Sequence, residues 1–279
     1  MAGRVIVGRA KLTGSLLRLG SLVRSSLGVA FGLAAVLGGC SALVPAGDTP
    51  DDSTVSVWIE ALVVEGPDGT PWVDVGYPQL HEAPGDPRAA VLRAINATIR
   101  DSVAAVTEAL YPSARSPAGV QPVIEIQGGL AALFVTDDVL STRVGIDAYT
   151  GGAHGTSTVV TLTFDLHTGL ALAPHDLFRP STPWGDTLAT HVERAVRDAL
   201  PHRLGLPHDV ASGAFVAEGL GAIREGYLDL TLGADSLDIH VGPYELAPYA
   251  AGTFDVRVPY ESIAPFVRVG SVLALLAER

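Results

Sequence analysis

The clearest pattern along the chain is an alternation of apolar and polar residues in VVTLTFDL, residues 159–166. A period of two residues is typical of a strand that buries one face. Similar runs predict strands at 54–64, 72–77, 122–127, 131–136, 142–149, 227–232, 237–241 and 254–259. Glycine and proline between the runs predict turns, including tight hairpin turns at 66–69, 167–169 and 233–235.

Two segments show instead the period of an amphipathic helix. In the first, Asp86 and Pro87 suit the N-cap and first helical position, and apolar residues then recur every three or four positions from Leu92 to Leu110. The second runs from about Trp184 to Leu200. We also expect a short helix within 210–220 and mostly helical structure over 260–276. Because strands and helices alternate irregularly, the pattern predicts an α+β fold of antiparallel sheets with two or three packed helices.

The first forty residues have the organisation of a bacterial lipoprotein signal. Five basic residues precede an apolar run at 27–37 that is too short to span a bilayer comfortably. Small residues then lead into Cys40, the only cysteine in the chain. This resembles a lipobox, in which the cysteine is lipidated and becomes the new N-terminus. An uncleaved signal anchor with a chance cysteine is the alternative interpretation.

This interpretation sets the expected domain organisation. We expect a signal peptide at 1–40, a flexible tether at 41–53 and an α+β domain at 54–279, with a possible subdivision into 54–120 and 121–279. The predicted location is the extracytoplasmic face of the cell membrane, held there through lipidated Cys40.

Removal of the signal makes the chain strongly acidic. The residues after Cys40 include thirteen basic and 30 acidic side chains, a net charge of −17, and no lysine. This charge argues against nucleic acid and anionic membrane surfaces as partners, because both require positive charge. A cationic partner would be attracted, although an acidic surface is also an ordinary means of keeping an exported protein soluble.

The residues capable of chemistry do not form a catalytic motif. Eight histidines occur without HExxH, HxH or H-x3-H spacing, and neither a GxSxG elbow nor a Gly-Lys-Ser/Thr phosphate loop is found. Acidic pairs such as Asp137-Asp138 lie beside predicted turns, which favours solvated loop acids. We therefore expect no catalytic residue, no metal ligand and no cofactor.

One irregular loop, YTGGAHG at 149–155, carries residues that a solvent-facing turn does not require. Tyr149 and His154 flank Gly151 and Gly152, whose backbone would let a ligand approach closely. The alternative is a wide bulged turn whose histidine hydrogen-bonds the backbone.

A second irregular loop, PYELAPYAAG at 243–252, presents Tyr244 and Tyr249. Tyrosines at loop tips often mark a binding surface, but such tyrosines are also ordinary core residues. With Tyr149, Gly151, Gly152 and His154 they form the predicted ligand-binding set.

Three groups of residues together resemble a known family. The first is YTGGAHG (149–155), followed by a strand, a turn at Gly169 and HDLF (175–178). The second is PYELAPYAAG (243–252), followed by a strand and VPYESI (258–263). A weaker third is Tyr77-Pro78-Gln79-Leu80 with Ile95-Asn96 in the first helix.

This order resembles bacterial envelope domains that form the extracytoplasmic part of lysozyme-binding anti-sigma factors and the N-terminal region of some peptidoglycan deacetylases. The resemblance covers about residues 55–275 and implies recognition of lysozyme or of cell-wall glycan. No sigma-binding segment and no separate catalytic domain are expected, so neither sigma regulation nor deacetylation is carried over. The leading hypothesis is a lipid-anchored, non-enzymatic binding module. The alternatives are a wall hydrolase or deacylase using His154, and a structural envelope lipoprotein.

Overall fold

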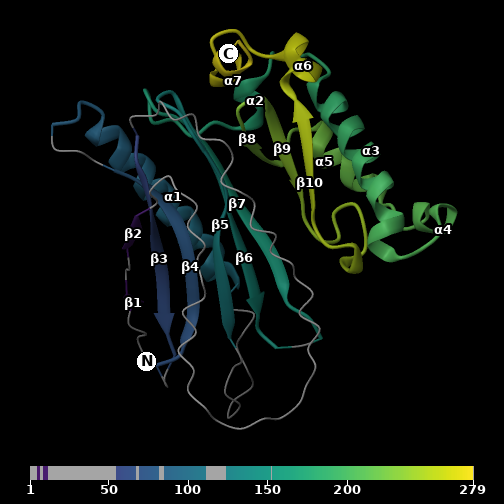
Figure 1. Ribbon diagram of the computed structural model, residues 1–279, viewed down its shortest axis with the longest axis horizontal. Helices are drawn as coiled ribbons and strands as arrows, with labels where there is room; N and C mark the ends of the chain where they lie inside the picture. The colour runs from purple at the N-terminus through teal and green to yellow at the C-terminus, as the bar shows by residue number, and fades with distance from the viewer. Residues whose placement is uncertain are drawn as a thin grey trace.

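The computed structural model describes residues 5–6, 9–11, 55–66, 69–81, 85–110, 124–151 and 153–278. Cys40, the tether at 41–53 and Gly152 lie outside these described residues. The fold is α+β, as predicted, with one large and one small β-sheet lying side by side (Figure 1). Among the described helices, none has the length and apolar character needed to cross a bilayer.

The large sheet is built from five long strands, with two short N-terminal strands added at one edge. Its order is β1-β3-β4-β5-β6-β7, and β2 also pairs with β3. The strands are β1 (Val5–Ile6), β2 (Arg9–Lys11), β3 (Val57–Glu65), β4 (Pro71–Leu80), β5 (Glu125–Val135), β6 (Val139–Tyr149) and β7 (Thr156–Asp165). Neighbouring strands in the described part of this sheet are antiparallel, except that β4 and β5 are parallel. A parallel pair needs a long crossover, which contains helix α1 (Ala89–Leu110).

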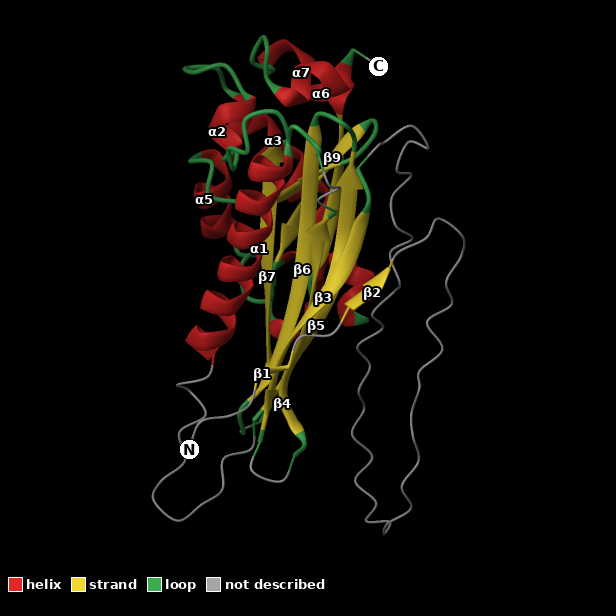
Figure 2. Cartoon of the chain, turned by 90° about the vertical axis from the view of Figure 1, so that its left-hand side faces the viewer, coloured by secondary structure: helices red, strands yellow, loops and turns green. Residues whose placement is uncertain are grey.

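Helix α1 covers one face of the large sheet (Figure 2). Its predicted apolar face is confirmed, because Leu92, Ile95, Ile99 and Val103 are buried in the core beneath it. The predicted role of Asp86 also holds, since its carboxylate accepts the backbone N–H of Arg88 at 2.7 Å. These features follow from the spacing of apolar residues and from the preference of aspartate for helix starts.

Buried Asn96 of α1 forms hydrogen bonds with the backbone at the end of β4. The Leu80 N–H donates to Asn96 Oδ1 at 2.7 Å, and Asn96 Nδ2 donates to the Leu80 carbonyl at 2.9 Å. Gln79 Nε2 donates to the Asn96 carbonyl at 3.2 Å. The weaker third group of family residues therefore has a structural role. Its side chains supply hydrogen-bond partners to backbone groups at the end of β4.

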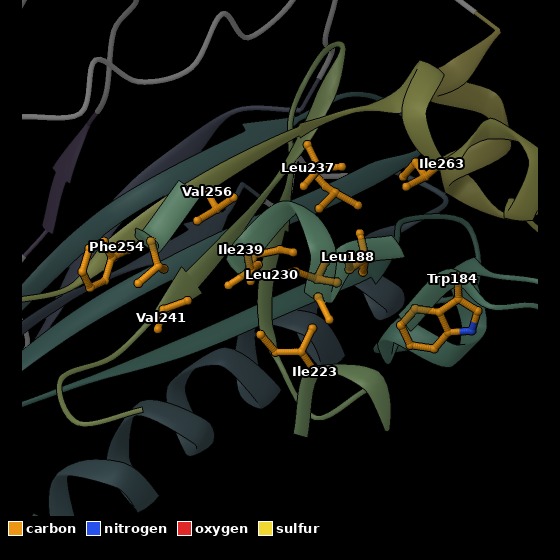
Figure 3. Packing of buried hydrophobic residues seen from close by; sticks show 14 of the residues in the cluster. Trp184, Leu188, Ile223, Leu230, Leu237, Ile239, Val241, Phe254, Val256 and Ile263 are labelled. Carbon is orange, nitrogen blue, oxygen red and sulfur yellow. The ribbon is translucent and has the colours of Figure 1, made fainter. Parts of the chain in front are cut away.

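The small sheet has the order β10-β9-β8 and is antiparallel throughout its described strands. It consists of β8 (Asp229–Leu232), β9 (Ser236–Val241) and β10 (Phe254–Pro259). Helix α3 (Trp184–Leu204) and short helix α5 (Leu220–Arg224) pack with it around a second core (Figure 3). At Gly185 an added Cβ would lie 2.3 Å from the Arg224 carbonyl oxygen, so glycine permits the close approach of α3 and α5. The remaining short helices are α2 (Pro174–Leu177), α4 (His208–Ser212), α6 (Tyr260–Ile263) and α7 (Val272–Ala277).

The two sheets are joined by polar side chains of the large sheet. Thr161 Oγ1 of β7 donates to Asp229 Oδ1 of β8 at 2.6 Å. The Leu232 N–H donates to Ser141 Oγ of β6 at 2.8 Å, and Ser141 is itself hydrogen-bonded to Thr163. These bonds set β8 against the last strands of the large sheet.

Three details differ from the sequence prediction. The strands expected at 122–127 and 131–136 are one strand, β5, with a register shift between Leu130 and Ala132. Gly169 takes the expected positive φ of 76°, but the returning chain forms only a single bridge with β7. The helix expected at 260–276 is interrupted by a 3-10 turn at 264–266 and by Gly270, whose φ is 77°.

Candidate functional site

The two irregular loops, about ninety residues apart in the sequence, meet in space. The His154 ring stacks on Tyr249 with centroids 4.3 Å apart and an interplanar angle of 27°. The Tyr244 ring lies 5.7 Å from Tyr249 and 6.4 Å from His154. We call these three residues the aromatic cluster. Both loops extend from one end of their sheets, the first joining β6 to β7 and the second joining β9 to β10.

Tyr244 is held in a costly conformation at the surface. Its side chain is 61% exposed and its φ is 69°, a left-handed value that is unfavourable for a bulky residue. A core role for Tyr244 is therefore wrong, whereas Tyr249 is half-buried beneath its neighbours. Strained residues persist where the surrounding structure holds them, and such residues gather at functional sites.

The first loop has features of both structures considered for it, a ligand-binding loop and a bulged turn. His154 is exposed, and its Nδ1 lies 2.8 Å from the Gly155 carbonyl oxygen, the local bond expected of a bulged turn. The same ring also stacks on Tyr249 from the other loop. Gly151 has a φ of 91°, which favours glycine. Tyr149 is the last residue of β6, opposite Glu125, and is 37% exposed.

A hollow of about 80 Å³ opens between the two sheets and the second loop. Its polar lining comes from β7, β8, β9 and the residues around Tyr244, and includes Ser157, Thr158, Asp229, His240, Gly242 and Glu245. None of these residues belongs to the set predicted from sequence. They come from four separate segments, and only the tertiary fold brings them together.

The carboxylate of Glu245 is partly withdrawn from water. Burial raises the pKa of Glu245, and the charge of Asp229 raises it further, while a backbone hydrogen bond from Gly242 and the charge of His240 oppose the rise. A Cβ on Gly242 would lie 2.7 Å from Glu245 Oε1, so glycine leaves the space that this carboxylate occupies.

A charged network beneath the hollow holds His240. His240 Nδ1 lies 2.8 Å from Asp255 Oδ1, and Arg143 Nη2 donates to Asp255 Oδ2 at 3.1 Å. The Arg143 side chain, from β6, is only 7% exposed. Burial acts to raise the pKa of Asp255, but the hydrogen bonds from His240 and Arg143 and their charges outweigh it and lower the pKa to about 2. The network links the large sheet to β9 and β10.

Several other residues that carry the family resemblance have a structural role. Leu177 and Phe178 of HDLF, and Tyr260 and Ile263 of VPYESI, are buried in the second core. The Tyr260 hydroxyl donates to the Gly233 carbonyl at 2.7 Å. His175 and Asp176 of HDLF are exposed, so only the last two residues of that motif contribute to the second core.

The described residues contain no group of three or more His, Cys, Asp or Glu side chains arranged to hold a metal ion. Asp138, one of the paired acids noted from the sequence, has an ordinary partner, since it bonds His167. The site offers exposed ring faces, hydroxyl groups and carboxylates.

Residues 175–261 match a protein family described as a protein of unknown function (DUF3298). This segment holds α3, the small sheet and the second aromatic loop. A search of the curated proteins found no match.

Two solved structures are similar over most of the chain. A crystal structure of a DUF3298 family member from Bacteroides fragilis NCTC 9343 has 13% identity and a TM-score of 0.50, and covers 81% of this chain and 97% of its own. A DUF3298 family protein from Pseudomonas aeruginosa PAO1 has 14% identity and a TM-score of 0.46, and covers 78% and 96% respectively. The first of these shows a shared fold.

Proposed function

We propose that this protein is a lipid-anchored binding module of the cell envelope, and that the aromatic cluster recognises a cationic, lysozyme-like protein. The observation that carries the proposal is the meeting of the two loops, with Tyr244 displayed at the surface in a strained conformation. Exposed aromatic side chains that project from a rigid scaffold are typical anchors of protein interfaces.

Charge favours a cationic partner. The chain after Cys40 carries a net charge of −17, and Asp229 and Glu245 line a hollow at the second loop, where Glu245 directly follows Tyr244 in the sequence. An acidic surface attracts a basic protein, accelerates its association and makes binding weaken as salt is added. A lysozyme-like protein is the partner implied by the family resemblance of these same loops.

Attachment to the membrane rests on the lipobox at Cys40. We expect Cys40→Ala to leave an unprocessed precursor that does not incorporate lipid, measured by gel mobility and by labelling with a palmitate analogue. Normal processing and lipidation of this variant would rule out the lipoprotein assignment.

The test of recognition is a titration of the full-length chain with a cationic lysozyme at low and moderate salt. We expect saturable binding that Tyr244→Ala weakens by about tenfold or more, as is usual for a central aromatic anchor. The matched control is Leu170→Ala, because Leu170 is 63% exposed and lies in the turn at the opposite end of β7. This control should bind within about twofold of the unmodified chain. Equal affinities for the two variants would contradict the proposal.

A second candidate is cell-wall glycan, which the exposed Tyr244 ring favours because aromatic faces pack against sugar rings. In this case the chain would sediment with purified sacculi in a manner independent of salt, and Tyr244→Ala would release it. Sedimentation that moderate salt abolishes would exclude this candidate.

A further inference from the structure

The hollow lined by Gly242, Pro243 and Glu245 of the second loop has carboxylates on two of its walls. Asp229 comes from β8 and Glu245 from the loop after β9. Asp229 accepts a hydrogen bond from Thr161, and Glu245 is held against the backbone of Gly242. Within the described residues, neither carboxylate forms a salt bridge with an arginine or lysine. Glu245 is partly desolvated, and Asp229 repels its charge more strongly than His240, which lines the same hollow, attracts it.

The volume of the hollow limits its occupant. A site for a complete small molecule usually measures about 300–1,000 Å³, whereas this hollow measures about 80 Å³. It nevertheless exceeds the roughly 10–15 Å³ needed for a single water. The space suits the terminal group of one side chain and is too small to enclose a sugar ring.

The hydrogen-bonding groups also favour a donor as occupant. The Ser157 hydroxyl donates to Asp147, which leaves its oxygen lone pairs as acceptors toward the hollow. The carboxylates of Asp229 and Glu245 are acceptors as well. Tyr244, which lies in the sequence between the lining residues Pro243 and Glu245, is exposed, and an aromatic face is favourable for a cation.

We propose that this hollow is a subsite for one basic side chain, an arginine or lysine of the bound protein. The side chain would place its charged nitrogen between Asp229 and Glu245 while its aliphatic stem packs against Tyr244. This inference rests on the proposed function in taking the partner to be a cationic protein. The inference adds the position at which a positive charge of the partner would bind.

The first experiment uses a small probe in place of a protein partner. N-acetyl-argininamide is titrated into the full-length chain, and the backbone amide resonances of Ser157, Thr158 and Gly242 are followed by NMR. The neutral control is N-acetyl-citrullinamide, which has nearly the same shape without the charge. We expect saturable shifts from the arginine probe with a Kd on the order of millimolar, and no saturable shift from citrulline. Equal responses to the two probes would overturn the inference.

Two variants separate the hollow from the general acidity of the chain. Glu245→Gln removes one charge from the wall, and we expect it to weaken the arginine probe by about fivefold or more. Asp198→Asn removes one charge from an exposed position on α3, and should change probe binding by less than about twofold. Equal effects of the two variants would show that only overall charge is sensed.

A lysozyme titration with the same variants distinguishes the two proposals. Binding that is lost in Tyr244→Ala but unaffected by Glu245→Gln would support recognition by the aromatic cluster and overturn the subsite. Saturable arginine binding without any lysozyme binding would support the subsite and refute lysozyme as the partner. Loss in both variants, with Asp198→Asn unaffected, is the result expected if both hold.

Discussion

Replacing Asp255 with asparagine should reveal how much the buried charge network contributes to stability. Asp255 and His240 are direct cross-strand neighbours on β10 and β9, and Arg143 reaches Asp255 from β6 of the large sheet. Asp255→Asn keeps the shape and one acceptor oxygen but removes the negative charge. The largely buried Arg143 then loses the countercharge that compensates its burial.

The magnitude follows from the pKa of Asp255. The pKa of Asp255 falls from the ordinary 3.8 to about 2. At about 1.4 kcal/mol per pKa unit, this shift corresponds to a stabilisation of at most about 2.4 kcal/mol. The Asp255 side chain is 47% exposed, and screening by solvent reduces this to about 1 kcal/mol. Because the folded-state pKa lies below the unfolded value, the contribution is fully present above pH 3.8 and is lost as pH falls toward 2.

The assay is urea unfolding of the full-length chain and its variants, followed by tryptophan fluorescence between pH 7 and pH 2.5. At pH 7 we expect Asp255→Asn to be less stable by about 1 kcal/mol or somewhat more, and the difference to shrink in the acid range. The control is Asp238→Asn, since Asp238 and its partner Arg257 are the next cross-strand pair on the same face of the same two strands, and Arg257 is exposed. This control should cost less than about 0.5 kcal/mol. A difference for Asp255→Asn that stays constant from pH 7 to pH 2.5 would refute the reasoning.

Three further predictions follow from single residues. Gly185→Ala should destabilise the second core by about 2 kcal/mol or more, or prevent folding, because the new Cβ would meet the Arg224 carbonyl; a normal melting temperature would contradict this. Asn96→Ala should cost about 2–4 kcal/mol in urea unfolding, since it leaves the N–H and C=O of Leu80 without partners, and a cost below about 0.5 kcal/mol would show that water replaces them. Tyr244→Asn should raise stability by about 1 kcal/mol, because asparagine tolerates positive φ, while weakening lysozyme binding. Calorimetry tests the expected gain in stability of this variant, and titration of the same sample tests the loss of binding. Unchanged stability would mean that the backbone of Tyr244 is not strained.

The sequence predicted the elements whose side-chain period is long and regular. The stripe from Leu92 to Val103 and the alternation in β7 specify their buried faces without help from distant residues. The parallel pairing of β4 with β5 was not predicted, because nothing local to either strand distinguishes parallel from antiparallel neighbours. The interruption at 264–270 could have been foreseen from Pro265 and Gly270, which oppose a continuous helix.

The residues of the candidate site were likewise predictable from the sequence only in part. Tyr244 and His154 were identifiable because aromatic side chains in glycine- and proline-rich loops have no evident local purpose, but the sequence did not predict that their loops meet, which the fold shows. The hollow was beyond reach, because Asp229 and His240 are ordinary strand residues in the sequence. Asp229 and His240 lie close to Glu245 only after two hairpins and the edge of β7 are assembled.

The parallel crossover has a consequence for the order of assembly. Pairing of Val73 with Ile126 must close a loop of more than fifty residues before any contact compensates the lost chain entropy. The strands of the small sheet are joined by much shorter connections and can pair early. The β6–β7 pair that carries the first aromatic loop is likewise local and bonds directly to β8, so the two aromatic loops can meet before β4 and β5 pair. A mutation in the crossover would therefore delay completion of the large sheet during refolding while leaving the recovery of binding and the final affinity unchanged.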